Sequence, residues 1–499
     1  MKLQEALERL DTYEKTSHAY SHAMGVISLD AVTCAPSGSA RGRGETMALL
    51  SEVTYKQLTD PATADMLHTI MEHSEEVTLK ARRQAEVLLE SYDELTRIPM
   101  DEYVEFSRLL NDADAVWHQA KLDSDFASFA PYLEKLVDYT RRFAAYKNDK
   151  KPVYDVLLNQ FEKGASMDML DPYFNALRKQ LTPLILAIAE KPEPRTDFLH
   201  QYYSVEAQRH FSDKLMEMMG IDRAYCGIGE TEHPFTNGFN RWDVRITTHY
   251  MEHDVASSMY SVIHEGGHAL YEMGIADDLQ FTCLGTGSSM GIHESQSRFY
   301  ENLIGRSFAF CQALLPVMRE CFPEQMQGID AETLYRAVNL AHPSLIRTEA
   351  DELTYALHIM VRYELEKQLM SGGLKVADLP AAWNAMYKDY LGVTVPNDRE
   401  GVLQDSHWSG GAFGYFPSYA LGSAYGAQML HFMEKDVDVW GTAAKGDLRP
   451  ITAWLGEKIH RYGQLLTPSQ LIENACGGPF DPHYFVDYLT EKYTALYNL

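Results

Sequence analysis

The stretch SVIHEGGHALYE, residues 261–272, places two histidines four residues apart, with a glutamate directly after the first. On a helix, His264 and His268 project from the same face one turn apart, so both imidazoles can reach one metal ion. Glu265 then lies beside the open coordination position, where a carboxylate can take a proton from water. The pattern predicts a metal-dependent hydrolase, and its chance occurrence is the alternative.

A catalytic metal site needs a third protein ligand, which this motif does not contain. Asp277 and Asp278 follow His268 too closely for the chain to turn and present them from a second helix. Glu294 comes 26 residues after His268, beyond the glycine-rich stretch LGTGSSMG, so a second helix can return across the first. Its apolar neighbours predict partial burial, and a buried carboxylate requires a cation partner. We therefore predict Glu294 as the third ligand. Glu301, two turns further on, is interpreted as a surface acid, with a role in orienting the ligands as the alternative.

Two glycines interrupt the helix that must carry the histidines. Gly266 and Gly267 each lower helix stability by about 1 kcal/mol relative to alanine in a helix interior. We expect this loss to be tolerated because another backbone passes close to that turn. The candidates are the helix with Glu294 and the strand of residues 243–247.

Most of the chain has the apolar periodicity of amphipathic helices. Clear examples are residues 1–24, 77–98, 126–146 and 344–369. In RWDVRITTHY, residues 241–250, apolar Trp242, Val244 and Ile246 instead alternate with polar residues, as in a half-buried strand. We predict a mostly α-helical fold with a small β-sheet next to the HExxH helix. The free edge of such a sheet can bind an extended peptide, and a structural hairpin is the alternative.

Composition limits the classes of partner and compartment. The 499 residues include 71 acidic and 44 basic ones, a net charge of −27 that disfavours nucleic-acid and membrane-surface binding. The six cysteines form no CxxC pair, and neither a signal peptide nor a membrane-spanning run is evident. We expect a soluble cytoplasmic protein. Without linkers or repeats, it is interpreted as one catalytic domain, 1–499, with a helical part over about 1–225 and a metal-site part over about 226–499.

Six motifs in a fixed order resemble the carboxypeptidase Taq family of metallocarboxypeptidases. They are HPF (233–235), DxRxT (243–247), HExxH (264–268), HESQSR (293–298), IRxxAD (346–351) and GxxQDxHW (401–408), followed by GYFPSY (414–419). The resemblance implies a large, saddle-shaped helical body with a deep substrate groove, which usually forms homodimers. It also implies a peptide substrate and the release of single C-terminal amino acids with broad specificity. Zn²⁺ is the expected cofactor, with Co²⁺ as the alternative, and Glu265 the general base.

Other site residues are candidates on chemical grounds and by this resemblance. The oxyanion that forms during hydrolysis needs donors besides the metal. Similar glutamate-ligand zinc peptidases, such as angiotensin-converting enzyme and thimet oligopeptidase, carry downstream histidine and tyrosine donors. The candidates here are His407, Tyr415 and Tyr419, with a packing role for each as the alternative.

An exopeptidase must also bind a terminal carboxylate. The guanidinium fork of Arg347 matches a carboxylate in two hydrogen bonds, and Arg245 is the second choice. Arg347 can alternatively pair with Asp351, four residues on, and the two roles can coexist. His233 of the HPF motif is assigned to substrate binding by the resemblance.

Two alternative functions stay open at this point. A zinc oligopeptidase or dipeptidyl carboxypeptidase would use the same metal chemistry and differ in how it binds the substrate carboxylate. A non-catalytic peptide-binding scaffold would be expected to lack a ligand or Glu265, yet all four positions are present.

Overall fold

The computed structural model describes residues 1–499 and is mostly α-helical, as predicted. Nine α-helices precede the sheet: α1 (Leu3–Thr33), α2 (Ala40–Thr59), α3 (Pro61–Glu72), α4 (Leu79–Thr96), α5 (Met100–Asp123), α6 (Phe126–Lys147), α7 (Val153–Phe161), α8 (Met167–Ala189) and α9 (Val205–Met219). The helices predicted at 1–24, 77–98 and 126–146 correspond to α1, α4 and α6.

The strand predicted from RWDVRITTHY is the central strand of a three-stranded sheet, β3 (Asp243–Thr248). It pairs in parallel with β1 (Cys226–Glu230) and antiparallel with β2 (Thr236–Asn240), so β2 is an edge strand. Val244 and Ile246 are fully buried, which explains the alternation seen in the sequence.

Eleven α-helices follow the sheet: α10 (Val255–Gly274), α11 (Met290–Arg298), α12 (Phe308–Cys321), α13 (Ala331–Val338), α14 (Glu352–Ser371), α15 (Leu379–Leu391), α16 (Pro417–Met433), α17 (Val439–Ala444), α18 (Arg449–Lys458), α19 (Pro468–Cys476) and α20 (His483–Tyr497). The HExxH motif lies on α10, which packs against β2, β3, α9 and α11. Glu294 lies on α11.

The helix predicted over 344–369 is shorter than expected. Helix α14 begins only at Glu352, because the Asp351 carboxylate caps it by accepting the backbone N–H groups of Leu353 and Thr354. The residues before it form a loop with one 3₁₀ turn, Arg347–Glu349. Because the Asp351 carboxylate caps α14, it does not form the ion pair with Arg347 that their spacing in the sequence allowed.

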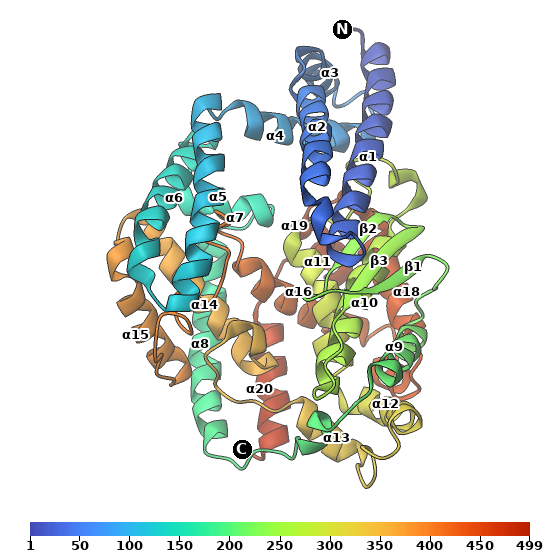
Figure 1. The fold of residues 1–499 in the computed structure, drawn as a ribbon. Coiled ribbons are helices and arrows are strands. Elements are labelled where there is room, and N and C mark those ends of the chain that lie inside the picture. Colours follow the sequence, from blue (N-terminus) through green and yellow to red (C-terminus); the bar gives the residue numbers. More distant parts are fainter.

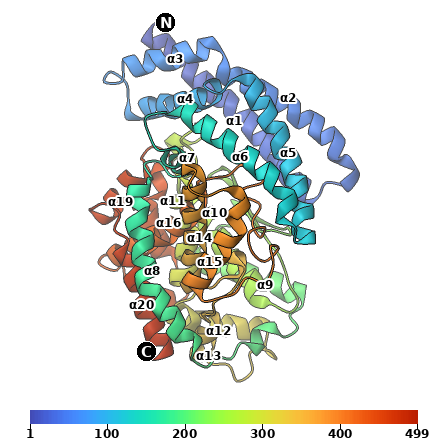
Figure 2. The same ribbon diagram turned by 90° about the vertical axis from the view of Figure 1, so that its left-hand side faces the viewer.

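The helices form a saddle-shaped body. Figure 1 shows α5, α6 and α15 on one flank and α1, α2, the sheet and α10 on the other, with α11 and α16 between them. In the side view of Figure 2, α1 to α6 form a layer above the rest of the chain. The sheet therefore lies beside the HExxH helix on one flank of the molecule, as predicted.

One continuous core connects most of the elements. A cluster of 104 buried side chains extends from Ala113 on α5 to Leu496 on α20, whereas α1, α3 and α4 share a separate cluster of only seven. The large cluster includes Leu215 of α9 as well as Val244 of β3, so it crosses the division expected near residue 225. The interpretation as one domain stays a prediction, and this shared core supports it.

Candidate metal centre

Helices α10 and α11 bring together the three residues predicted to bind a metal. Nε2 of His264 and Nε2 of His268 lie 3.9 and 3.7 Å from Oε2 of Glu294. Ligand atoms bound tetrahedrally to zinc at about 2.0–2.1 Å stand ~3.3 Å apart, so small inward movements would complete such a site. Glu294 is buried, as its apolar neighbours predicted. Two nitrogens and a carboxylate oxygen in this arrangement fit a divalent metal ion.

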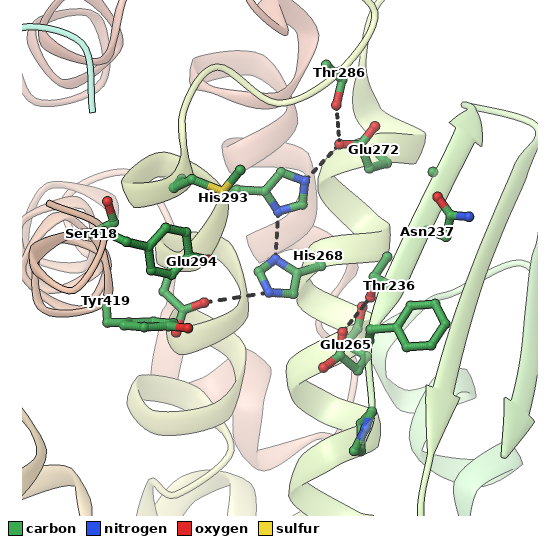
Figure 3. A pocket seen from close by; sticks show the side chains of 15 residues that line it. Thr236, Asn237, Glu265, His268, Glu272, Thr286, His293, Glu294, Ser418 and Tyr419 are labelled. Atoms are coloured by element: carbon green, nitrogen blue, oxygen red, sulfur yellow. Dashed lines mark hydrogen bonds and ion pairs between the residues drawn. The ribbon is translucent and has the colours of Figure 1, made fainter. Parts of the chain in front are cut away.

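The other ring nitrogen of each histidine is already hydrogen-bonded. Nδ1 of His264 lies 2.8 Å from Oε2 of Glu301. Nδ1 of His268 lies 2.7 Å from Nδ1 of His293, whose Nε2 lies 2.7 Å from Oε1 of Glu272 (Figure 3). The Glu272 carboxylate accepts the Nε2 proton of His293, so Nδ1 of His293 accepts in turn from Nδ1 of His268. Both chains of hydrogen bonds leave Nε2 of His264 and of His268 unprotonated toward the metal position.

Glu301 is not the surface acid that we expected. It lies on a π-helical turn, η4 (Phe299–Ile304), directly after α11, and its side chain is only 12% exposed. Burial alone would raise the pKa of this carboxyl, but Arg298, His264 and Arg306 hold it well below its usual range. The alternative, a role in orienting the ligands, fits this contact; the sequence did not favour it because Glu301 and His264 are far apart in the chain. π-Helical turns are rare in proteins, and those that occur are often at functional sites. Apolar periodicity in a sequence does not reveal them.

Glu265 lies on the sheet side of α10 and is 6% exposed. Thr236 Oγ1, on β2, donates a hydrogen bond to Glu265 Oε2 at 2.6 Å (Figure 3). Burial raises the pKa of Glu265, while His264 and the hydrogen bond from Thr236 oppose that rise. A carboxylate with this balance can accept a proton and return it at neutral pH. Thr236 was not among the sequence candidates, and its place directly after the HPF motif was the only signal.

The glycines of the motif mark the closest approach of two backbones. A Cβ atom on Gly267 would lie 2.7 Å from the carbonyl oxygen of Gln296 and from Cα of Ser297, both in α11. This confirms the expectation that another backbone passes this turn and identifies it as the Glu294 helix. At Gly266 a Cβ atom would instead meet the side chain of Met219, at 2.7 Å.

Helix α16 approaches α11 from its other side. A Cβ atom on Gly422 would lie 2.7 Å from Cβ and Cγ of Glu294. Small residues are concentrated in ALGSAYGA, residues 420–427, and this concentration could have indicated close helix packing. Glu294 is therefore held between α10 and α16.

A hollow of about 480 Å³ opens in front of the ligand atoms. Residues 234–238 line one wall, and Ser418 and Tyr419 line the opposite one (Figure 3). Tyr415 also lines the hollow, with its ring centre 5.1 Å from that of Tyr419. His407 lies behind this tyrosine wall, with Nε2 3.3 Å from the Tyr419 hydroxyl. Burial lowers the pKa of His407 to about 4, so its imidazole is neutral at pH 7.

Arg347 is also behind the tyrosine wall and does not line the hollow. Its guanidinium carbon lies 5.1 Å from the centre of the Tyr419 ring. Nε and Nη2 donate to Oδ1 of Asp405 at 2.9 and 2.8 Å, and Nη1 donates to the Tyr355 hydroxyl at 3.1 Å. Arg347 therefore pairs with Asp405 of the GxxQDxHW motif and not with Asp351.

The two other substrate-binding candidates lie outside the hollow. Arg245 donates from Nε and Nη2 to the two carboxylate oxygens of Asp243, at 2.8 Å each, and lies over the Phe239 ring. His233 is exposed beside Pro234, the first residue of the wall that β2 continues.

The fold and this site together define a class. Two imidazoles of α10 and the carboxylate of Glu294 on α11 converge at one point, and a second buried carboxylate, that of Glu265, lies on α10 beside the imidazoles. This is the arrangement of HExxH metal-dependent hydrolases. Comparison with known proteins narrows the class to one family, whose model, described as carboxypeptidase Taq (M32) metallopeptidase, matches residues 9–493. The chain belongs to this family and is a metallocarboxypeptidase.

Individual relatives agree over nearly the whole chain. Carboxypeptidase 1 of Bacillus subtilis (strain 168) is 40% identical over 494 residues, which are 99% of this chain and 98% of the relative. Thermostable carboxypeptidase 1 of Thermus thermophilus is 36% identical and covers 96% of each chain. The crystal structure of an M32 carboxypeptidase from Deinococcus radiodurans R1 superposes with a TM-score of 0.96 at 35% identity, over 99% of this chain and 100% of that one.

These comparisons confirm the resemblance read from the motifs and set aside the non-catalytic scaffold. Membership of a metallopeptidase family also agrees with a divalent metal at the ligand cluster. None of the helices combines the length and apolar character needed to cross a bilayer.

Proposed function

We propose that the protein is a zinc-dependent carboxypeptidase that hydrolyses the C-terminal peptide bond of peptides and releases single amino acids with broad specificity. The observation that carries this proposal is the cluster of His264, His268 and Glu294 beside the buried carboxylate of Glu265. Two imidazoles with one carboxylate favour zinc, with Co²⁺ as the alternative, over the oxygen-only sets preferred by Mg²⁺. The hollow is lined by neither lysine nor arginine, which favours broad acceptance of side chains.

The chemistry divides between the metal and Glu265. When bound, the metal acts as a Lewis acid that lowers the pKa of water and polarises a carbonyl group. Glu265 accepts a proton from the water that attacks the scissile carbonyl carbon. As the C–N bond breaks, the same carboxyl returns the proton to the amine of the leaving amino acid. Because Thr236 occupies Oε2, the other oxygen of Glu265 is the one that transfers the proton.

The tyrosine wall is proposed to stabilise the oxyanion. Tyr415 and Tyr419 line the hollow opposite β2, where a phenol can donate to a developing negative charge. Neutral His407 can donate from Nε2 to the Tyr419 oxygen, so that the Tyr419 proton stays available for the substrate. In this proposal His407 acts through Tyr419.

Arg347 is proposed to receive the substrate carboxylate, with Arg245 and His233 as less favoured candidates. Its positive charge lies directly behind Tyr419 and Tyr355, at the end of the hollow away from β2. Tyr355 occupies only Nη1, so movement of this phenol would expose one donor of the guanidinium group. Arg347→Lys should lower kcat/KM for peptides with a free C-terminus much more than for the same peptides as C-terminal amides. An equal loss for both would reject Arg347 as the receptor.

Metal analysis combined with product analysis tests the function. Purified protein should contain about one zinc ion per chain and release C-terminal amino acids one at a time, in order, from a short peptide. Chelation should abolish release, and Zn²⁺ or Co²⁺ should restore it. Glu265→Gln is the matched variant, because it should retain the metal while losing activity by about 10²–10⁴-fold. Release of dipeptides, or activity that chelation does not affect, would contradict the proposal.

Two further properties are proposed on weaker support. The family resemblance supports a homodimer, which light scattering of the purified protein would test. All six cysteines are unpaired, which supports a reducing compartment such as the cytoplasm. Fractionation of cells that produce the protein would test the location.

A further inference from the structure

A second hollow continues the first one away from the tyrosine wall. It has a volume of about 300 Å³ and opens between α1 and residues 280–286. Asn237, Gly238 and Thr286 line both hollows. The edge strand β2 therefore lines both hollows, and the two adjoin at these three residues.

An exposed aromatic pair stands at this second hollow. Phe281 lines the hollow and is 44% exposed, and Trp242, 42% exposed, stacks on it with ring centres 5.9 Å apart. The rings of His18 on α1 and Phe281 are nearly perpendicular, with their centres 5.0 Å apart. Phe281 has a φ of +61°, in the left-handed region that side chains other than glycine rarely adopt. Strained residues of this kind concentrate at ligand-binding sites.

The loop that carries Phe281 is anchored on both sides. The buried carboxylate of Glu14 on α1 accepts the backbone N–H of Cys283 at 2.9 Å and the side-chain amide of Gln84 on α4 at 2.8 Å. Thr282 Oγ1 donates to the carbonyl oxygen of Leu279 at 2.7 Å. These hydrogen bonds hold the loop in place although Phe281 is exposed. An aromatic surface that is already held in place loses little entropy when a ligand binds.

The chemistry of the second hollow differs from that of the tyrosine wall. No lysine or arginine lines it, and its one carboxylate, Glu14, is buried under its own hydrogen bonds. Burial, and then the neighbouring His22, lowers the pKa of His18, which favours the neutral ring. Phe239 adds a buried aromatic ring 4.8 Å from His22. The hollow thus offers aromatic and neutral polar surface. The guanidinium behind it, that of Arg245 over the Phe239 ring, is paired with both carboxylate oxygens of Asp243.

The phenol groups of Tyr415 and Tyr419, which line the first hollow and not the second, indicate the direction of a bound peptide. The carboxylate end belongs at the tyrosine wall, with Arg347 behind it, so the residues upstream of the scissile bond extend along β2 toward α1. An extended chain can pair with the free edge of a strand and places alternate side chains on one side. One upstream side chain then reaches Phe281.

We propose that the second hollow is a subsite for one residue upstream of the scissile bond, with preference for a large aromatic or apolar side chain. The proposal rests on the proposed function, because its occupant is the substrate chain itself. It assigns Phe281, with Trp242 stacked on it, as a specificity-determining residue that takes no part in the HExxH chemistry.

Peptides of five residues with a constant C-terminal dipeptide provide the test. Phenylalanine replaces alanine at each of the three upstream positions in turn, and kcat/KM is measured for the metal-loaded enzyme. At one position, phenylalanine should be preferred by about 10-fold, the scale of a partly buried apolar side chain. In Phe281→Ala this ratio should fall to between 1 and 2, and in Trp242→Ala it should fall part of the way. Phe308→Ala, equally exposed but on α12, is the matched control and should keep the wild-type ratio.

The possible results separate the two proposals. If no peptide loses its C-terminal residue, the proposed function fails. If release occurs with no positional preference for phenylalanine, or if Phe281→Ala and Trp242→Ala keep the preference, the subsite is wrong while the proposed function stands. Circular dichroism and metal content equal to wild type show that a lost preference is not a folding defect.

Discussion

The two sides of α10 meet different kinds of neighbour. On one side, Gly267 lies against the backbone of α11, and a Cβ atom there would be 2.7 Å from Gln296 and Ser297 main-chain atoms. On the other side, Gly266 faces the end of the flexible Met219 side chain. Backbone atoms cannot move aside without displacing a whole helix, whereas a methionine can change rotamer.

The difference corresponds to what each side must do. His268 and Glu294 face each other on the α11 side, and metal–ligand distances tolerate changes of only about 0.2 Å. Away from α11, Met219 at the end of α9 faces Gly266, and one hydrogen bond from Thr236 of β2 orients Glu265, the proposed general base. Backbone contact therefore sets the separation of the proposed ligands, and a side-chain contact orients the proposed base.

The largest expected effect comes from removing the ligand on the α11 side. Glu294→Gln should lower metal affinity by more than about 100-fold, since loss of a group that merely orients a ligand costs 10–100-fold. Activity at limiting zinc should fall by about 10³-fold or more. Metal content by mass spectrometry and initial rates measure this, with exposed Glu332→Gln on α13 as the control. Wild-type metal content in Glu294→Gln would rule out its role as a ligand.

The paired glycines test the comparison most directly. Gly267→Ala should lower the free energy of unfolding by about 2–3 kcal/mol and reduce kcat/KM by 10-fold or more, because α11 must shift. Gly266→Ala should change the free energy of unfolding by less than about 1 kcal/mol, since Met219 can rotate and alanine favours the helix. Urea unfolding and kinetics at saturating zinc measure both. Equal effects in the two variants would remove the distinction between the sides.

A buried carboxyl at the start of α11, that of Glu162, should make the stability of the protein depend on pH. Glu162 Oε2 accepts the N–H of Gly291 at the start of α11, at 2.8 Å, and burial raises the Glu162 pKa from 4.5 to about 7. The folded state therefore binds more protons than the unfolded state between these values, and the contribution of Glu162 to stability falls as pH rises through this window. Relative to wild type, Glu162→Gln should gain about 2 kcal/mol in free energy of unfolding between pH 5 and pH 8. Urea unfolding at both pH values measures this, and exposed Glu76→Gln should show no such gain.

The smallest effect is expected at the hydrogen bond on the sheet side. Thr236→Val keeps the shape of the side chain but removes the donor to Glu265, and should lower kcat by about 10-fold with normal metal content. Thr236→Ser restores the donor and should stay within about threefold of wild type. A loss of equal size in both variants would mean that Thr236 acts by packing rather than by its hydroxyl.

Local patterns in the sequence predicted the elements and the ligand cluster. Alternation in RWDVRITTHY predicted β3, and apolar periodicity predicted α1, α4 and α6. The spacing of HExxH and the length of the segment before Glu294 predicted residues that do converge. The start of α14 was misplaced, because the capping by Asp351 competes with periodicity and a single carboxylate decides the boundary.

Contacts between distant segments were not predictable in the same way. Glu301 was taken for a surface acid, and nothing in the sequence pairs Arg347 with Asp405 rather than with Asp351. The pairing of His293 with His268 was also missed, although both stand in recognised motifs. Each of these contacts depends on how two elements pack, which the period of either element alone does not contain.

The sequence by itself determined the identity and relative order of the chemical groups. An α-helix repeats every 3.6 residues, so His264, His268 and Glu265 acquire their mutual positions from spacing alone. The tertiary structure decided which groups support them, namely Glu301, His293 with Glu272, and Thr236, and it placed two adjoining hollows along β2. The physical reason is that hydrogen bonds across elements are set by helix packing distances, which Gly267 and Gly422 fix only once the helices have met.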